Sequence, residues 1–199
     1  LRLEELAAIG DDATAPESQA AIEQADRLSD TIDALLRLSR TGRAGVATRF
    51  DLRALASNHA ADVVLALRRQ RRRLDIVAGP PLVVEAAPGA VGQTLDVLLW
   101  NAVKHGSGAV TVRLVSDGDW AEVSVSDEGE IAAESLDEIF VQPSRSDEHG
   151  IGLPLARRII ESEGGRLDIP SHAPTTFRIR LPRSTSATVN VAEAIEADD

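Results

Sequence analysis

The sequence predicts an α+β sandwich preceded by a helical hairpin. Segments with the apolar period of a helix alternate along the chain with shorter segments in which apolar and polar residues alternate, as they do in strands. The turn Asp117-Gly118-Asp119 separates two such shorter segments and predicts an antiparallel hairpin. Helices interrupted by antiparallel hairpins are typical of the α+β class.

The composition limits the classes of site and partner. The chain of 199 residues is long enough for one core of about 130 to 150 residues and a smaller element. It has no cysteine, which excludes thiol chemistry and zinc-ribbon sites, and its four histidines show no paired ligand spacing. The net charge of -11 argues against general affinity for nucleic acid or anionic lipid, so we expect no nucleic-acid partner.

The first segment, residues 1–44, is predicted to be part of a helical hairpin. Residues 1–9 have the pattern of a helix end, residues 10–16 form a breaker-rich loop, and a second helix covers about 17–40. The second helix has a heptad seam formed by Ala21, Ala25, Leu28, Ile32 and Leu35. The seam is short, so it fits a dimer contact and packing on the chain's own domain equally well.

The central segment, residues 45–182, begins after a Gly-Arg-Ala-Gly linker. Asp51 is the predicted N-cap of a helix to about Arg69. Strand-like runs follow at 74–77 and 82–84, and then a helix over 88–105 with Pro88 in its first turn. The five arginines at 68–73 are interpreted as cations near helix C-terminal carbonyls and in a solvated turn.

The second half of this segment continues the alternation. Residues 109–116 and 120–126 form the predicted hairpin, and residues 151–163 form a helix closed by Gly164-Gly165. A final strand pair is expected at 166–169 and 175–181. Residues 183–199 have the composition of a disordered acidic tail.

Three short stretches carry polar residues or glycines that element periodicity does not require. The first is Asn101, Lys104 and His105 at a helix end. An amide oxygen there can bind a divalent cation, and Lys104 can reach phosphate oxygens. Lysine and histidine at a helix end also serve the helix dipole, so this stretch alone is weak evidence.

The second stretch is Asp127-Glu128-Gly129, directly after a predicted strand. A carboxylate at a strand end can accept a hydrogen bond from an exocyclic amine such as that of adenine, and glycine allows close backbone approach. Ordinary turns use the same Asp-x-Gly pattern.

The third stretch is Gly150-Ile151-Gly152-Leu153 at the start of a predicted helix. Free N–H groups at a helix start can bind an anion such as a triphosphate. A flexible hinge before a helix has the same pattern.

The order of the three stretches resembles the ATP-binding domain shared by sensor histidine kinases, gyrase-type topoisomerases and Hsp90-type chaperones. Residues 95–106 resemble the asparagine box of that group, Asp127-x-Gly129 its first glycine box, and Gly150-x-Gly152-Leu153 its second. Ile139-Phe140 resembles the phenylalanine box, and 159–167 the stretch after the second glycine box. The resemblance covers about half of the chain.

The resemblance implies a two-layer ATP-binding domain with a mixed, largely antiparallel sheet and helices on one face. It implies Mg²⁺ coordination by Asn101, phosphate contact by Lys104, and adenine recognition by Asp127. Residues 141–149 would form a mobile lid. The implied ATP site consists of Asn101, Lys104, His105, Asp127, Gly129, Gly150, Ile151, Gly152 and Leu153.

Two residues beside the asparagine indicate which branch of the group the chain resembles. ATP-hydrolysing members carry a glutamate four residues before the asparagine as a general base, and here that position is Val97. The neighbouring Asp96 points about 100° away on a helix. Residues 25–40 resemble the second helix of the dimerisation and phosphotransfer domain of sensor kinases, which favours phosphotransfer over hydrolysis.

The chain departs from that family in two places. Residues 1–9 match the end of the helix that carries the phosphate-accepting histidine, but they contain no histidine. Glu130-Ile131 stands where the first glycine box has a second glycine. Because the sequence begins without methionine and within a helical pattern, we expect it to be a fragment of a longer protein.

The resemblance therefore implies the ATP-binding catalytic portion of a sensor histidine kinase. We expect a response regulator as a partner, a homodimer through the hairpin, and an acceptor histidine upstream or supplied in trans. We expect a cytoplasmic location, with membrane attachment only through upstream segments. The alternatives are a degenerate, non-catalytic module that regulates a partner kinase, and a serine-directed anti-sigma-factor kinase, which normally lacks the hairpin.

Overall fold

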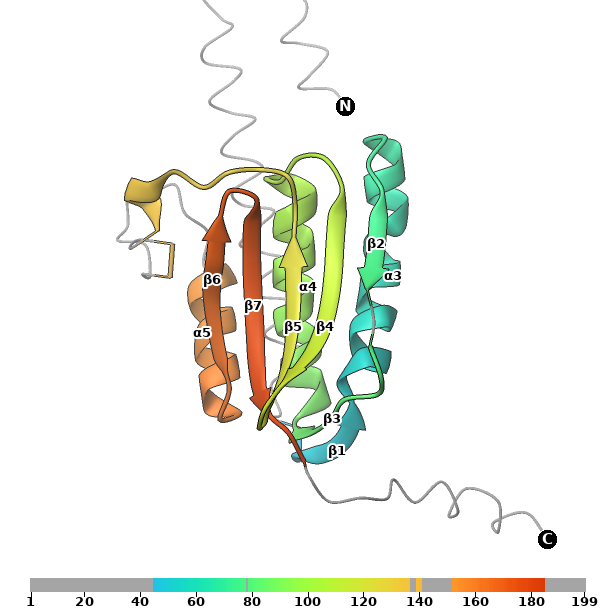
Figure 1. The fold of residues 1–199 in the computed structure, drawn as a ribbon, viewed down its shortest axis with the longest axis vertical. Helices are drawn as coiled ribbons and strands as arrows, with labels where there is room; N and C mark the ends of the chain where they lie inside the picture. The colour runs from blue at the N-terminus through green and yellow to red at the C-terminus, as the bar shows by residue number, and fades with distance from the viewer. Residues whose placement is uncertain (1–44, 78, 137–138, 141–151, 185–199) are drawn as a thin grey trace, which may run out of the picture.

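The computed structural model has two layers, a sheet and a row of helices that covers one of its faces (Figure 1). It describes residues 45–77, 79–136, 139–140 and 152–184. The predicted hairpin at 1–44, the lid at 141–149, and Gly150 and Ile151 lie outside the described residues. No helix in the described ranges is both long and apolar enough to cross a membrane.

The main sheet has five strands in the order β2-β4-β5-β7-β6. Its strands are β2 (Leu74–Val77), β4 (Val110–Asp117), β5 (Trp120–Ser126), β6 (Arg166–His172) and β7 (Thr175–Pro182). The pair β2 and β4 is parallel, and the other three pairs are antiparallel. The sheet is thus mixed and largely antiparallel, as predicted.

A second, two-stranded sheet lies at one end of the domain (Figure 1). It pairs β1 (Thr48–Asp51) with β3 (Val83–Ala86) in antiparallel register. The chain returns to this sheet after β7, because Arg183 bridges to Val84 and the Ser184 N–H donates to the Val83 carbonyl.

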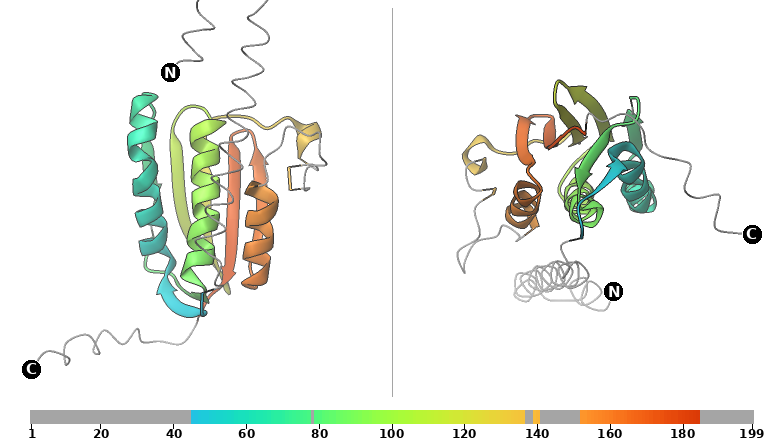
Figure 2. Two further views of the ribbon diagram at one scale, coloured as in Figure 1. Left: turned by 180° about the vertical axis from the view of Figure 1, so that it is seen from behind. Right: turned by 90° about the horizontal axis from the view of Figure 1, so that it is seen from below.

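Three α-helices lie side by side on one face of the main sheet (Figure 2). They are α3 (Leu52–Arg69), α4 (Pro88–Lys104) and α5 (Gly152–Ser162), and a short 3-10 helix, η1 (Ala133–Ser135), follows β5. Asp51 caps α3 as predicted, with its carboxylate accepting from the Arg53 N–H at 3.0 Å. Pro88 occupies the first turn of α4, where its missing N–H costs nothing.

The core fills the space between the helices and the main sheet. Alternate strand residues such as Val123 and Ile179 face the helices and are fully buried. Their helical partners are aliphatic residues repeated at intervals of three and four, among them Leu95 and Leu98 of α4. The central helix α4 is therefore fixed on three sides, between α3, α5 and the sheet.

Most predicted elements are confirmed, and the differences lie at short or exposed segments. The strand β1 was not predicted, because its first two residues are exposed and its partner β3 lies more than 30 residues away. The strands β3 and β6 run further than predicted, to Ala86 and His172. Backbone hydrogen bonds continue to Ser184. The predicted start of the tail, residue 183, is therefore at least two residues too early.

Candidate functional site

Asp127 lies at the end of β5 and is almost completely buried, with 6% of its surface exposed. Its Oδ1 accepts two backbone hydrogen bonds, from Gly129 at 2.7 Å and from Ser107 at 3.2 Å. No described group donates to Oδ2. The two N–H groups fix the carboxylate by one oxygen and leave the other able to accept a hydrogen bond from a ligand.

Backbone bonds on both sides hold Asp127 in place. On one side, the Glu128 N–H donates to the Ser107 carbonyl at 2.9 Å. On the other, the Asp127 N–H donates to the Thr175 carbonyl at 3.0 Å, and the Thr175 N–H donates to the Gly129 carbonyl at 2.8 Å. Residues 127–129 are thus clamped between the loop after α4 and the start of β7.

Two glycines make room for the carboxylate. A Cβ on Gly106 would lie 2.5 Å from Asp127 Cγ and 2.6 Å from the Ala102 carbonyl oxygen. A Cβ on Gly129 would lie 2.6 Å from Asp127 Oδ1. Since real Cβ atoms do not approach this closely, both positions require glycine for the observed geometry.

The last turns of α4 carry the predicted residues Asn101, Lys104 and His105. Asn101 is half-buried and Lys104 is exposed in the last turn. His105 is the C-cap, and its N–H donates to the Asn101 carbonyl at 2.8 Å. Asn101 follows Val97 by one helical turn, so the two share a face of α4. An amide oxygen and an ammonium group on the end of one helix suit a cation and a phosphate, respectively.

The start of α5 lies against that same face of α4. A Cβ on Gly152 would be 3.4 Å from Val97 Cγ1, which places the first residue of α5 directly beside Val97. Of the predicted second glycine box, only Gly152 and Leu153 are described. Phe140 lies nearby, with the Arg157 guanidinium of α5 stacked 5.0 Å from its ring centroid.

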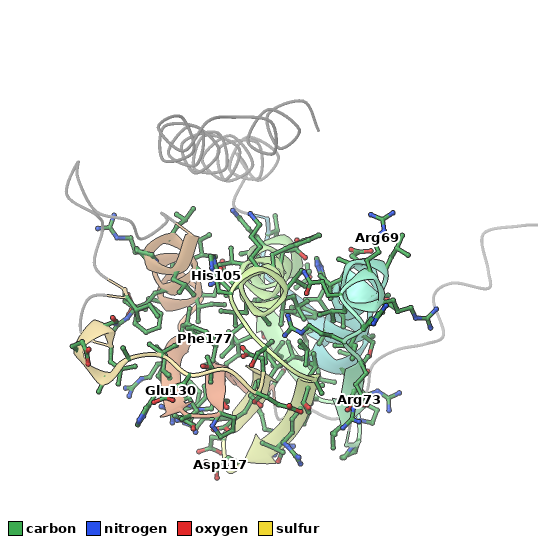
Figure 3. All side chains as sticks on the ribbon, turned by 90° about the horizontal axis from the view of Figure 1, so that it is seen from above. Arg69, Arg73, His105, Asp117, Glu130 and Phe177 are labelled. Carbon is green, nitrogen blue, oxygen red and sulfur yellow. The ribbon has the colours of Figure 1, made fainter. Side chains whose placement is uncertain are left out.

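The described site residues therefore gather around the end of α4. Gly106 links them, because it touches both Asp127 and the Ala102 carbonyl next to Asn101. The end of α4 and the start of the loop after β5 lie at the same end of the domain (Figure 1), and Figure 3 looks onto the domain along that axis. The buried Asp127 carboxylate, the Asn101 amide and the Lys104 ammonium group thus lie near the start of α5, which begins at Gly152.

Sequence reasoning missed three residues that build the site. Ser107 and Thr175 bind the backbone or carboxylate of residues 127–129, and Arg72 binds the loop that contains Ser107. The glycines that flank Ser107 were a signal, since they allow the loop to approach Asp127 closely. Nothing in the local sequence marks Thr175 or Arg72, because both act across long stretches of chain.

A separate polar contact joins α3 to the opposite flank of α4. His59 Nδ1 lies 2.6 Å from Asp96 Oδ1, and the imidazole packs on Gly92, where a Cβ would be 2.5 Å from Nε2. The hydrogen bond to Asp96 and the nearby Asp62 charge raise the pKa of His59 above its ordinary value, against the effect of burial. Asp96 is thus engaged away from the predicted site.

Comparison with known proteins assigns the family. The model of the family described as "Histidine kinase-, DNA gyrase B-, and HSP90-like ATPase" matches residues 86–185, from the end of β3 to just beyond β7. The matched range contains every predicted site residue.

Curated relatives are sensor proteins. The chain is 29% identical over 174 residues to the sensor histidine kinase ZraS of Escherichia coli K12, covering 83% of this chain and 37% of that protein. It is 34% identical over 103 residues to the sensor protein PfeS of Pseudomonas aeruginosa, covering 48% of this chain and 23% of that protein. The chain therefore spans well under half the length of these relatives.

Solved structures of the same class share the fold. The mycobacterial sensor histidine kinase MprB is 25% identical with a TM-score of 0.58, covering 69% of this chain and 98% of that one. Full-length ShkA, in complex with AMPPNP, has a TM-score of 0.68 at 23% identity and covers 89% of this chain and 40% of that one.

The family match, the sensor-kinase relatives and the shared two-layer fold agree with the arrangement of Asn101, Asp127 and Gly152 around α4. This chain belongs to the histidine kinase-, DNA gyrase B- and HSP90-like ATPase family.

Proposed function

We propose that this chain is the ATP-binding catalytic portion of a sensor histidine kinase. It transfers the γ-phosphoryl group of ATP to a histidine outside the chain, and a response regulator then receives the group. We further propose a homodimer through residues 1–44 and a cytoplasmic site of action. The proposal draws on the family, on the sensor-kinase relatives and on the site at the end of α4.

The observation that carries the proposal is the geometry of the Asp127 carboxylate. It is buried, its Oδ1 is held by two N–H groups, and its Oδ2 receives no hydrogen bond from a described residue. An ionised carboxylate oxygen accepts hydrogen bonds, so Oδ2 can accept one from a ligand N–H. The 6-amino group of adenine is such a donor.

The α4 face from Val97 to Lys104 suits the phosphate end of the nucleotide. Asn101 offers an uncharged oxygen, the donor type that Mg²⁺ accepts together with phosphate oxygens, so it would hold that ion. Mg²⁺ would neutralise charge on the phosphates. Lys104 places a positive charge at the same helix end, and we assign it to a phosphate contact.

In the proposed reaction, a histidine nitrogen forms a bond to the γ-phosphorus, the bond to the β,γ-bridging oxygen breaks, and ADP leaves. Such transfers need positioning and charge neutralisation more than covalent help from the protein. Val97 supports transfer to histidine over transfer to water. Its apolar side chain lies beside Gly152 and cannot accept a proton from a water molecule.

The test has two parts. Calorimetry with ATP and Mg²⁺ on the full chain is expected to show saturable binding that weakens when Mg²⁺ is removed. A peptide or domain that carries an acceptor histidine is then added with labelled ATP, and acid-labile phosphate should appear on that histidine. The absence of binding contradicts the whole proposal.

A second candidate is a non-catalytic ATP-binding and dimerisation module that regulates a partner kinase. The observation that favours it is the loop Glu130-Ile131, where the Ile131 N–H donates to the His172 carbonyl of β6 at 2.9 Å. This bond ties the loop to β6, and both loop residues carry side chains where a second glycine would have none. Normal ATP binding without phosphate transfer to any supplied histidine supports this candidate over the first.

A further inference from the structure

Arg72 leaves α3 through a tight turn that directs it toward α4. The turn has both hydrogen bonds of a Schellman motif, from the Arg72 N–H to the Leu67 carbonyl at 2.9 Å and from the Arg71 N–H to the Arg68 carbonyl at 3.0 Å. Arg71 has the left-handed φ of 59° that usually selects glycine at this position. The turn directs the Arg72 side chain toward the end of α4.

The Arg72 guanidinium joins the last turn of α4 to the loop that follows it. Its Nε donates to the Gly108 carbonyl at 2.7 Å, and its Nη1 donates to the Val103 carbonyl at 3.2 Å. Its Nη2 is buried without a partner among the described residues. Because an unsatisfied buried N–H is unfavourable, stability alone is a poor explanation for an arginine here.

The loop held by Arg72 is the loop that holds Asp127. Ser107, next to Gly108, donates its N–H to Asp127 Oδ1 and accepts from the Glu128 N–H. Gly108 has a φ of +58°, and the Glu128 side chain packs directly over it. The loop at residues 106–108 is therefore held by Arg72 through the Gly108 carbonyl, and by residues 127 and 128 through Ser107.

We propose that Arg72 is a positioning residue for recognition of the adenine 6-amino group. By fixing Gly108 it sets the Ser107 N–H, which fixes Asp127 Oδ1 and so directs Oδ2 toward the amine. This inference rests on the proposed ATP site. It differs from a general stabilising role because loss of Arg72 should affect only the part of the ligand that Asp127 recognises.

The neighbouring arginines provide matched controls. The side chains of Arg68, Arg69 and Arg71 are exposed and make no hydrogen bond or ion pair within the described ranges. Arg69 projects from the end of α3, away from His105 (Figure 3). An Arg69→Met variant makes the same chemical change as Arg72→Met, three residues earlier and without touching the loop.

The experiment measures two ligands by calorimetry on the full chain with Mg²⁺. One is ATP, and the other is purine riboside triphosphate, which lacks the 6-amino group. The wild type should bind ATP about tenfold more tightly than the analogue. Arg72→Met should weaken ATP binding about five- to tenfold and leave analogue binding within about twofold, and Arg69→Met should change neither.

An Arg72→Lys variant keeps a cation that can donate to one carbonyl. It replaces Arg72→Met in the same measurement if Arg72→Met does not fold. It should lose about two- to fivefold in ATP affinity, with the analogue unchanged. Arg72 variants that bind ATP as the wild type does, or that weaken both ligands equally, overturn the inference. A wild type that binds neither triphosphate overturns the proposed function itself, and one that binds both equally removes the Asp127 role on which the inference depends.

Discussion

Two carboxylates, Asp96 in α4 and Asp127 after β5, differ in burial and in their hydrogen-bond partners. Asp96, on the flank toward α3, has 28% of its side chain exposed and shares a 2.6 Å hydrogen bond with His59. Asp127, at the end of α4, is buried, and both of its hydrogen bonds fall on one oxygen. The first carboxylate is satisfied by another side chain, and the second is oriented by backbone toward a partner that no described residue supplies. The difference separates a contact that joins two helices from one prepared for a ligand.

The largest effect should come from removing each carboxylate in turn. Asp127→Ala should weaken ATP binding about 10- to 100-fold, because a hydrogen bond to a charged group contributes about 1.5 to 3 kcal/mol. Asp96→Ala should leave the affinity within about twofold, because its partner is His59. Calorimetry on both variants makes the comparison, and equal losses in the two would erase the distinction between the carboxylates.

The next prediction concerns the free energy of unfolding and compares alanine substitutions of glycines at the two ends of α4. Gly106→Ala should lower the free energy of unfolding by about 1 to 3 kcal/mol, because its Cβ would strike Asp127 and the Ala102 carbonyl. Gly89→Ala is the control, since a Cβ there meets nothing within 4 Å. It should leave stability unchanged or raise it by up to about 1 kcal/mol. Urea unfolding measures both, and an unchanged stability of Gly106→Ala would contradict the tight packing of Gly106 against Asp127.

The smallest effect concerns the contact between α3 and α4, and it depends on pH. The folded pKa of His59 is raised above 6.5, chiefly by its hydrogen bond to Asp96. The contact therefore contributes its full stability below the unfolded pKa and loses it as the pH rises through the folded value. The contribution should be about 1 kcal/mol.

The test compares the wild type with His59→Ala in urea unfolding at several pH values. The stability difference between them should shrink as the pH rises above 6.5, while ATP affinity stays the same in both. A difference that is constant with pH would show that His59 stabilises the helix pair by packing on Gly92 and not by charge.

Local signals made much of this fold predictable. Asp51 caps α3 with its own side chain, and Gly118 supplies the left-handed φ of 55° in the turn between β4 and β5. The apolar spacing of α4 placed that helix to within a residue. In each case the residues that define the element lie within a few positions of one another.

The parts that escaped prediction depend on pairs far apart in the chain. Arg72 meets Gly108 across 36 residues, and His59 meets Asp96 across 37. The pairing of β1 with β3 is equally distant, and β1 has too little apolar pattern to mark it. Asp127 and Gly129 could be singled out from their motif, but the second N–H on the carboxylate, from Ser107, follows only from the fold.

The ATP site at the end of α4 is tested most directly by NMR, with backbone amide signals recorded while ATP and Mg²⁺ are added to the full chain. Saturable shifts are predicted for the amides of Ser107, Asp127 and Gly129, with the signals of His59 and Asp96 unmoved. Shifts centred on His59 and Asp96, or no saturable shift at Ser107 and Gly129, would contradict the assignment of the ATP site to the end of α4.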